Sequence, residues 1–162
     1  MSDQPAGTAA AQPTPSNLAL TVNMQYVKDF SFENPRAPQV FASNEHAPQV
    51  QVNVDVNARP VAENMYEVTL VLNAEAKSAD QPVFVVELTY AGLFTLPALP
   101  QEQIRPLLLI ECPRMLFPFA RAIIAESTRD GGFPPLMINP IDFAALYRQQ
   151  AQAAAAAAAG TA

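Results

Sequence analysis

The sequence predicts an α+β fold, in which a four-stranded antiparallel meander sheet is followed by two helices. Four stretches between residues 18 and 94 alternate apolar and polar side chains with the period of two that is typical of half-buried strands. After Pro100 the apolar spacing becomes helical, and prolines and glycines divide this part of the chain. Half of the 162 residues are hydrophobic, enough for a core, which excludes a chain that is disordered throughout.

The first predicted strand begins at Leu18 and ends before Pro35. Its last part lies in YVKDFSFENPRAP (residues 26–38), where successive side chains should point to opposite sides of the strand. Strict alternation assigns Tyr26, Phe30 and Phe32 to an aromatic face, and Asp29, Ser31 and Glu33 to an acidic one. Residues 34–48 contain three prolines and are predicted to form a loop.

Three further strands are predicted at residues 50–57, 65–77 and 83–94. In VQVNVDVN, the first of these, every second residue is a valine, so one face is apolar and the other polar. The last strand is apolar on both faces apart from Glu87 and Thr89. Because such strands are buried on both sides, we expect it at the centre of the sheet or at a subunit contact.

The first helical region spans residues 101–129. Three prolines should break or kink it, because proline lacks the N–H that a helix interior needs: Pro106, Pro113 and Pro118. The most regular helix is therefore expected from about Pro113 to Arg129, with Gly131 and Gly132 as its C-cap.

A second helix is expected within residues 138–150, with Asn139 as N-cap and Pro140 at the first helical position. The Ala-rich tail at 151–162 has high helix propensity but nothing to pack against, so it should fray. Residues 1–17 are rich in Ala, Pro, Gln and Thr without apolar periodicity, and we predict a disordered arm. One domain is thus expected at 18–150, between the arm and the tail.

The chain is acidic, with a formal charge of -6 and a pI near 4.6. This disfavours nucleic acid and anionic membrane surfaces as partners, because both require basic surfaces. Residues 18–97 carry nine acidic and four basic residues, whereas residues 98–150 carry five of each. A basic partner is therefore expected to dock on the first half of the fold. The N-terminus lacks the features of a signal peptide, and no apolar run reaches the ~18 residues of a spanning helix, so we expect a cytoplasmic protein without membrane insertion.

Few residues in the sequence could support catalysis or bind a metal. His46 is the only histidine and Cys112 the only cysteine, so they cannot form a zinc site, and a disulfide within the chain is excluded. Cys112 precedes Pro113 in an apolar stretch, where a buried, inert thiol is expected. The five glycines lack the spacing of a phosphate-binding loop. We expect neither a metal nor another cofactor, and no enzyme.

Asp29 and Glu33 are the remaining catalytic candidates. Four residues of strand separate their Cα atoms by ~13 Å, whereas paired catalytic carboxyl groups are ~5–10 Å apart. A solvated strand face or a docking surface for a basic partner fits them better. Two helices can cover only one face of a four-stranded sheet well, and the sequence has more apolar side chains than this arrangement would bury. The excess favours an oligomer with an apolar binding surface.

The chain resembles the SecB family of protein-export chaperones over about residues 18–150. The resemblance rests on four blocks that occur in the order and spacing of that family: YVKDFSFENPRAP, YEVTLVLNAEA, FVVELTYAGLF and CPRMLFPFARAIIAESTRDGGFPPLMINPIDFAALY. It implies four antiparallel strands followed by two helices, assembling as a homotetramer that is a dimer of dimers. It also implies an ATP-independent holdase, which keeps secretory precursor proteins unfolded and delivers them to the SecA translocation motor.

The resemblance also assigns roles to individual positions. Asp29, Glu33 and Glu87 match the flat acidic surface that receives the basic, zinc-bearing C-terminus of SecA. The groove for unfolded clients is matched by four positions: Val50, Val52, Val54 and Tyr147. The strand-four positions that are tied to subunit assembly are matched by Val86, Leu88 and Tyr90.

Two other classes of function stay open from the residues alone. A carrier of small apolar ligands would use the same groove, and would bind a lipid at one site per chain while ignoring unfolded protein. A carboxylate-based enzyme would require a raised pKa at Asp29 or Glu33, and would lose activity when that residue is changed to the amide.

Overall fold

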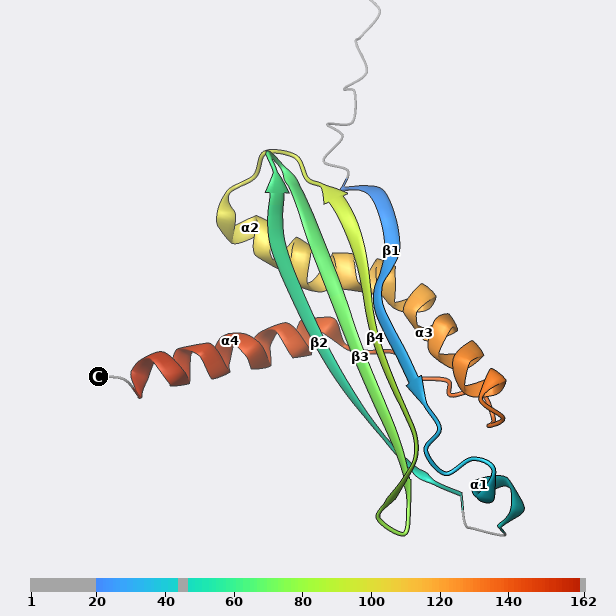
Figure 1. The fold of residues 1–162 in the computed structure, drawn as a ribbon. Coiled ribbons are helices and arrows are strands. Elements are labelled where there is room, and N and C mark those ends of the chain that lie inside the picture. The colour runs from blue at the N-terminus through green and yellow to red at the C-terminus, as the bar shows by residue number, and fades with distance from the viewer. Residues whose placement is uncertain (1–19, 44–46, 161–162) are drawn as a thin grey trace, which may run out of the picture.

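The computed structural model describes residues 20–43 and 47–160 (Figure 1). The predicted N-terminal arm and His46 lie outside these residues. The strands are β1 (Thr21–Glu33), β2 (Gln49–Ala62), β3 (Met65–Ser78) and β4 (Gln81–Thr95). The helical segments are α1 (Gln39–Ala42), α2 (Gln101–Pro106), the π-helical η1 (Leu107–Glu111), α3 (Cys112–Asp130) and α4 (Phe143–Ala159).

The four strands form one antiparallel sheet in the order β1-β4-β3-β2, which confirms the predicted α+β class and the central place of β4. The meander holds for β2, β3 and β4, but β1 pairs with β4 and not with β2. The long connection through residues 34–48 allows this, because only a short loop forces two consecutive strands into a hairpin. The crossover also gives β4 a neighbour on each side.

The helices cover one face of the sheet, and the other face carries no element of the described chain (Figure 1). We call the uncovered side the open face. On the covered side, even-numbered side chains of β3 and β4 meet α3 and η1 in the hydrophobic core. Its largest fully buried side chains include Leu70, Leu72, Leu88, Phe94 and Phe143.

Strand β1 does not keep the strict alternation that the sequence predicted. Its pairing with β4 shifts between Val22 and Met24, and again between Val27 and Asp29. Tyr26 therefore lies opposite Ala91, on the open face, whereas Phe30 lies opposite Leu88 on the covered face. A bulge inserts one residue into a strand and so exchanges the faces of the residues before it, here as far as the other register shift. The predicted aromatic face is thus wrong for Tyr26 and correct for Phe30 and Phe32.

The prolines of the first helical region change its hydrogen bonding but do not end it. Residues 101–130 form one continuous helical stretch, in which η1 lies between Pro106 and Cys112. Pro106 has no N–H and so cannot make the hydrogen bond of a regular helical turn. The wider π-type turn that follows it therefore sacrifices no hydrogen bond that a regular helix would have kept. The α3 segment begins at Cys112 and ends at Asp130, close to the predicted bounds, and contains Pro118.

Helix α4 begins later than predicted. Asp142, and not Asn139, is its N-cap, and the Asp142 side chain accepts a hydrogen bond of 2.9 Å from the backbone N–H of Ala145. The helix continues to Ala159, and residues 151–160 are exposed throughout. No helix in the described residues is long and apolar enough to span a bilayer.

Candidate binding surfaces

The open face carries the three carboxylates that the sequence singled out. Glu87 of β4 lies opposite Ser31 of β1, so it stands between Asp29 and Glu33 on the neighbouring strand. All three side chains are exposed. The structure therefore brings the predicted acidic residues together, although two bulges disturb the strand that carries two of them.

The register adds two carboxylates that the sequence analysis did not assign to this surface. Asp55 of β2 pairs with Val71, and Glu75 of β3 pairs with Val85, which places both on the open face. We call the five carboxylates of this region the acidic patch: Asp29, Glu33, Asp55, Glu75 and Glu87. The alternation of β2 and β3 shows that Asp55 and Glu75 belong to polar faces, but only the strand order shows that these faces coincide.

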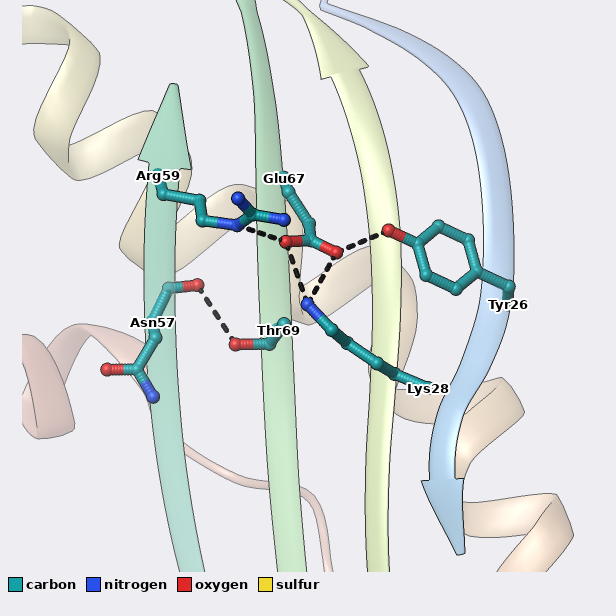
Figure 2. Close-up of polar contacts among 6 residues, drawn as sticks. All are labelled: Tyr26, Lys28, Asn57, Arg59, Glu67 and Thr69. Atoms are coloured by element: carbon teal, nitrogen blue, oxygen red, sulfur yellow. Dashed lines mark hydrogen bonds and ion pairs between the residues drawn. The ribbon is translucent and has the colours of Figure 1, made fainter. Parts of the chain in front are cut away.

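A second polar cluster occupies the other half of the open face (Figure 2). The Glu67 carboxylate accepts hydrogen bonds from the Tyr26 hydroxyl at 2.5 Å, from Lys28 Nζ at 2.9 and 3.0 Å, and from Arg59 Nε at 2.5 Å. These partners come from β1 and β2, and the β1 side chains reach Glu67 across β4, where Ala91 is small. The cluster thus connects both edge strands to β3.

The Glu67 side chain is buried, with 4% of its surface exposed, yet it is charged. The hydrogen bond from Tyr26, followed by that from Lys28, lowers the pKa of Glu67 to about 2, against the opposing effect of burial. Burial and the bond to Glu67 raise the pKa of Tyr26 to about 12. Nothing in the sequence distinguishes Glu67 from a solvent-facing residue of β3, because its partners on β1 are about 40 residues away.

The covered side of β2 contains an apolar groove of about 340 Å³. It contains the three predicted client-groove valines, and the connection from α3 to α4 supplies the rest of its lining: Val50, Val52, Val54, Leu136, Met137, Ile138, Asn139 and Ile141. Val50 is 40% and Met137 61% exposed, so the groove opens to solvent. Tyr147, the fourth predicted residue, is half-buried on α4 and does not line the groove.

The predicted assembly residues of β4 lie inside the single chain. Val86, Leu88 and Tyr90 are 0%, 1% and 8% exposed, because even-numbered positions of β4 point at the helices. The Tyr90 hydroxyl donates a hydrogen bond of 3.2 Å to Gln25 Oε1 of β1. The single chain thus buries all three side chains, to which the family resemblance gave a role in subunit assembly.

Exposed apolar side chains gather instead on the edge strand and on α3. On the covered side of β1, Val22, Val27 and Phe30 are 38%, 48% and 41% exposed. On α3, Met115 and Phe119 are 40% and 53% exposed. The backbone edge of β1 that faces away from β4 pairs with no other strand of the described chain.

The geometry gives no support to carboxylate or thiol chemistry. Asp29 and Glu33 are exposed on the flat face of a sheet, where nothing removes water from a reacting group. Cys112 is fully buried, as predicted, and burial raises the pKa of its thiol to about 12, which keeps the thiol protonated. No group of three or more potential metal ligands occurs among the described residues.

Comparison with known proteins identifies the family. The family model described as preprotein translocase subunit SecB matches residues 12–154. The protein-export protein SecB of Rhodospirillum centenum is 55% identical over 143 residues, which cover 88% of this chain and 85% of the relative. That of Bradyrhizobium sp. is 53% identical over 138 residues, 85% of each chain.

A solved structure confirms the fold. The SecB-like chaperone of Mycobacterium tuberculosis, in complex with a ChAD peptide from an antitoxin, superposes with a TM-score of 0.64. It is 13% identical, and the match covers 75% of this chain and 90% of that one. The family model and the identity to the curated relatives over most of both chains lead to one conclusion: the chain belongs to the SecB family of protein-export proteins.

Proposed function

We propose that this chain is an ATP-independent chaperone of protein export, which binds unfolded precursor proteins in the groove beside β2 and delivers them to SecA. The observation that carries the proposal is the exposed, valine-lined groove on one side of the sheet, with an acidic patch on the other. A protein built in this way can hold a client on one side while a basic partner docks on the opposite side. Both steps take place in the cytoplasm, before the precursor reaches the membrane.

The groove suits an extended apolar segment better than one defined ligand. Its lining is almost entirely aliphatic, and it is open along β2, so side chains of different shapes can enter. Each contact contributes only through the area it buries, at about 25 cal/mol per Å², reduced by the cost of ordering the client. Many weak contacts of this kind give binding that tolerates diverse sequences and still allows release.

The acidic patch suits a basic partner. Four of its five carboxylates are exposed, and Glu75 is half-buried. They lie on a flat surface and so act at longer range, increasing the association rate and selecting against acidic proteins. Such contacts weaken with salt, because mobile ions screen exposed charges. We assign the docking of SecA to Asp29, Glu33 and Glu87, with Asp55 and Glu75 extending the surface.

Assembly as a dimer of dimers accounts for the remaining apolar surface. The free edge of β1 exposes unpaired backbone N–H and C=O groups, and Val22, Val27 and Phe30 lie beside it. An edge of this kind readily pairs with the same edge of a second chain. Met115 and Phe119 of α3 would then be covered as well, either within the dimer or between dimers.

Calorimetric titration with one secretory precursor, first unfolded and then folded, tests the proposal. Without nucleotide, we expect binding of the unfolded form alone, with a negative heat-capacity change from apolar burial. Binding of neither form would contradict the chaperone assignment. Saturable binding of a fatty acid at one site per chain would then favour a carrier of small apolar ligands, for which a groove of about 340 Å³ is large enough.

A further inference from the structure

The open face is divided into an acidic half and a half with an excess of positive charge. In the Glu67 cluster, two cations share one carboxylate, whereas in the acidic patch only Glu75 is paired with a cation, Lys77, at 3.2 Å. The two halves lie on the same surface, since Lys28 directly precedes Asp29 on β1. A partner that docks on this face therefore meets opposite charges at its two ends.

Between the two cations lies a small polar pocket of about 140 Å³. It is lined by Lys28, Asn57, Ala58, Arg59, Glu67 and Thr69. All of these side chains except that of Ala58 are drawn in Figure 2. Since a water molecule occupies about 30 Å³ in the liquid, the pocket has room for a carboxylate group with a little water. The pocket opens on the open face of the sheet, the same face that carries the acidic patch.

The donors around this pocket exceed the acceptors that the chain supplies. Arg59 uses only Nε toward Glu67, and its two terminal nitrogens make no hydrogen bond to the described residues. Lys28 carries three N–H donors and directs two contacts at the same carboxylate. Both cations keep much of their surface in solvent, with 43% of the Lys28 and 67% of the Arg59 side chain exposed. One more carboxylate would give each cation a partner of its own.

We propose that the pocket between Lys28 and Arg59 binds a carboxylate side chain of the basic partner that docks on the acidic patch. This carboxylate fixes the direction in which the partner lies along the strands. The inference rests on the proposed docking function of the open face. Without the pocket, a basic segment could lie on the acidic patch in either direction with similar contacts, because exposed charges define no register.

The register gives the spacing that the partner needs. Thr69 at the pocket pairs with Ala91, and Glu87 in the acidic patch lies four residues from Ala91 along β4. Four residues of strand span ~13 Å, so an extended partner should carry its acidic residue about four residues from the basic residue that contacts Glu87. An acidic residue on either side of the basic stretch can reach the pocket, and the side on which it lies determines the direction in which the segment runs along the strands.

Titration of the full-length protein with synthetic peptides tests this arrangement. One peptide carries Asp four residues before a run of Lys and Arg, another carries it four residues after the run, and in a matched peptide of each kind Asn replaces Asp. We expect each Asp peptide, running in opposite directions along the strands, to bind about two- to five-fold more tightly than its Asn counterpart, the gain typical of an exposed ion pair.

The variant Arg59→Gln should abolish this difference, while Glu67 keeps Tyr26 and Lys28 as partners and the fold is retained in thermal unfolding. Arg148→Gln removes the same charge from exposed α4 and should preserve the difference. If the Asn peptides bind but neither Asp position improves binding, the carboxylate pocket is wrong and the docking surface stands. If no basic peptide binds the wild-type protein, the docking surface itself is wrong, and the pocket with it.

Discussion

Glu67 shows how a single residue can be essential to a surface without being exposed on it. It is the only buried carboxylate of the described chain, and three side chains from both edge strands bind it. Removing the carboxylate charge would leave Lys28 and Arg59 unpaired beside the acidic patch. The residue thus contributes both to the sheet and to the charge pattern of the open face.

Glu67 should make the stability of the protein depend on pH in the acid range. Its pKa is lowered from 4.5 to about 2 in the folded state, so its contribution is complete above pH 4.5 and is lost as the pH falls toward 2. The shift corresponds to about 3 kcal/mol of unfolding free energy. Urea unfolding of the wild type and of Glu67→Gln, at one protein concentration and several pH values, measures this.

The Gln variant should be less stable at pH 7 and should lose less stability than the wild type between pH 5 and pH 2. Tyr26→Phe provides a second comparison, since it removes the first cause of the lowered pKa but retains both cations. An unchanged pH dependence in Glu67→Gln would show that other carboxylates determine acid unfolding.

Glu87 should affect partner binding and not stability, because it is exposed and lies at the centre of the acidic patch. Glu87→Lys should abolish or strongly weaken SecA binding, leaving the binding of unfolded client and the thermal stability unchanged. Glu63→Lys is the matched control, with the same charge reversal in the turn after β2. Normal SecA binding by Glu87→Lys, measured at low salt, would contradict the docking assignment.

At the scale of the elements, a charge introduced on β2 should weaken client binding only where the changed residue lines the groove. Val50→Asp places a carboxylate in the groove at a position already 40% exposed, so it should weaken unfolded-client binding with little effect on folding. Val61→Asp is the control, since Val61 lies on the same strand, is 50% exposed and does not line the groove. Equal losses in both variants, measured calorimetrically, would point to a non-specific effect of charge.

The elements also show what the sequence can and cannot predict. The four strands, both long helices and the central place of β4 follow from alternation, helical spacing and an apolar strand. The bulge at Lys28 does not, because a polar residue on a mixed strand fits either face, and so Tyr26 was assigned to the wrong side. The order of β1 and β2 depends on the path of the residues 34–48 connection, which local pattern does not encode.

The same limit applies to the sites. Asp29, Glu33 and Glu87 could be predicted because each lies on the polar face of its strand and also matches an acidic position of the family. The structure brings the three residues together. The family resemblance linked Val86, Leu88 and Tyr90 to subunit assembly, and the apolar pattern of β4 could not show that helices of the same chain bury all three. The Glu67 cluster requires contacts between strands that are distant in the sequence, and no local pattern shows these.

At the scale of the whole molecule, one sheet separates two kinds of binding surface. The helices cover the side that holds the apolar groove beside β2 (Figure 1), and the other side carries the acidic patch and the Glu67 cluster. Because the groove and the acidic patch share strand β2 but no side chains, we expect that client and partner can be bound at the same time. This separation makes the behaviour of each surface measurable on its own.

The free edge of β1 predicts that the protein assembles into an oligomer through this strand. Val27→Glu and Phe119→Glu each place a charge on an exposed apolar position, one beside the free edge and one on α3. If these surfaces join the subunits, light scattering after size exclusion should show a tetramer for the wild type and smaller species for both variants, because burying an unpaired carboxylate costs several kcal/mol. Met137→Glu is the control, since Met137 is 61% exposed but lies at the client groove. It should weaken client binding and leave the mass unchanged, whereas a tetramer that persists in Val27→Glu would place the subunit contact away from β1.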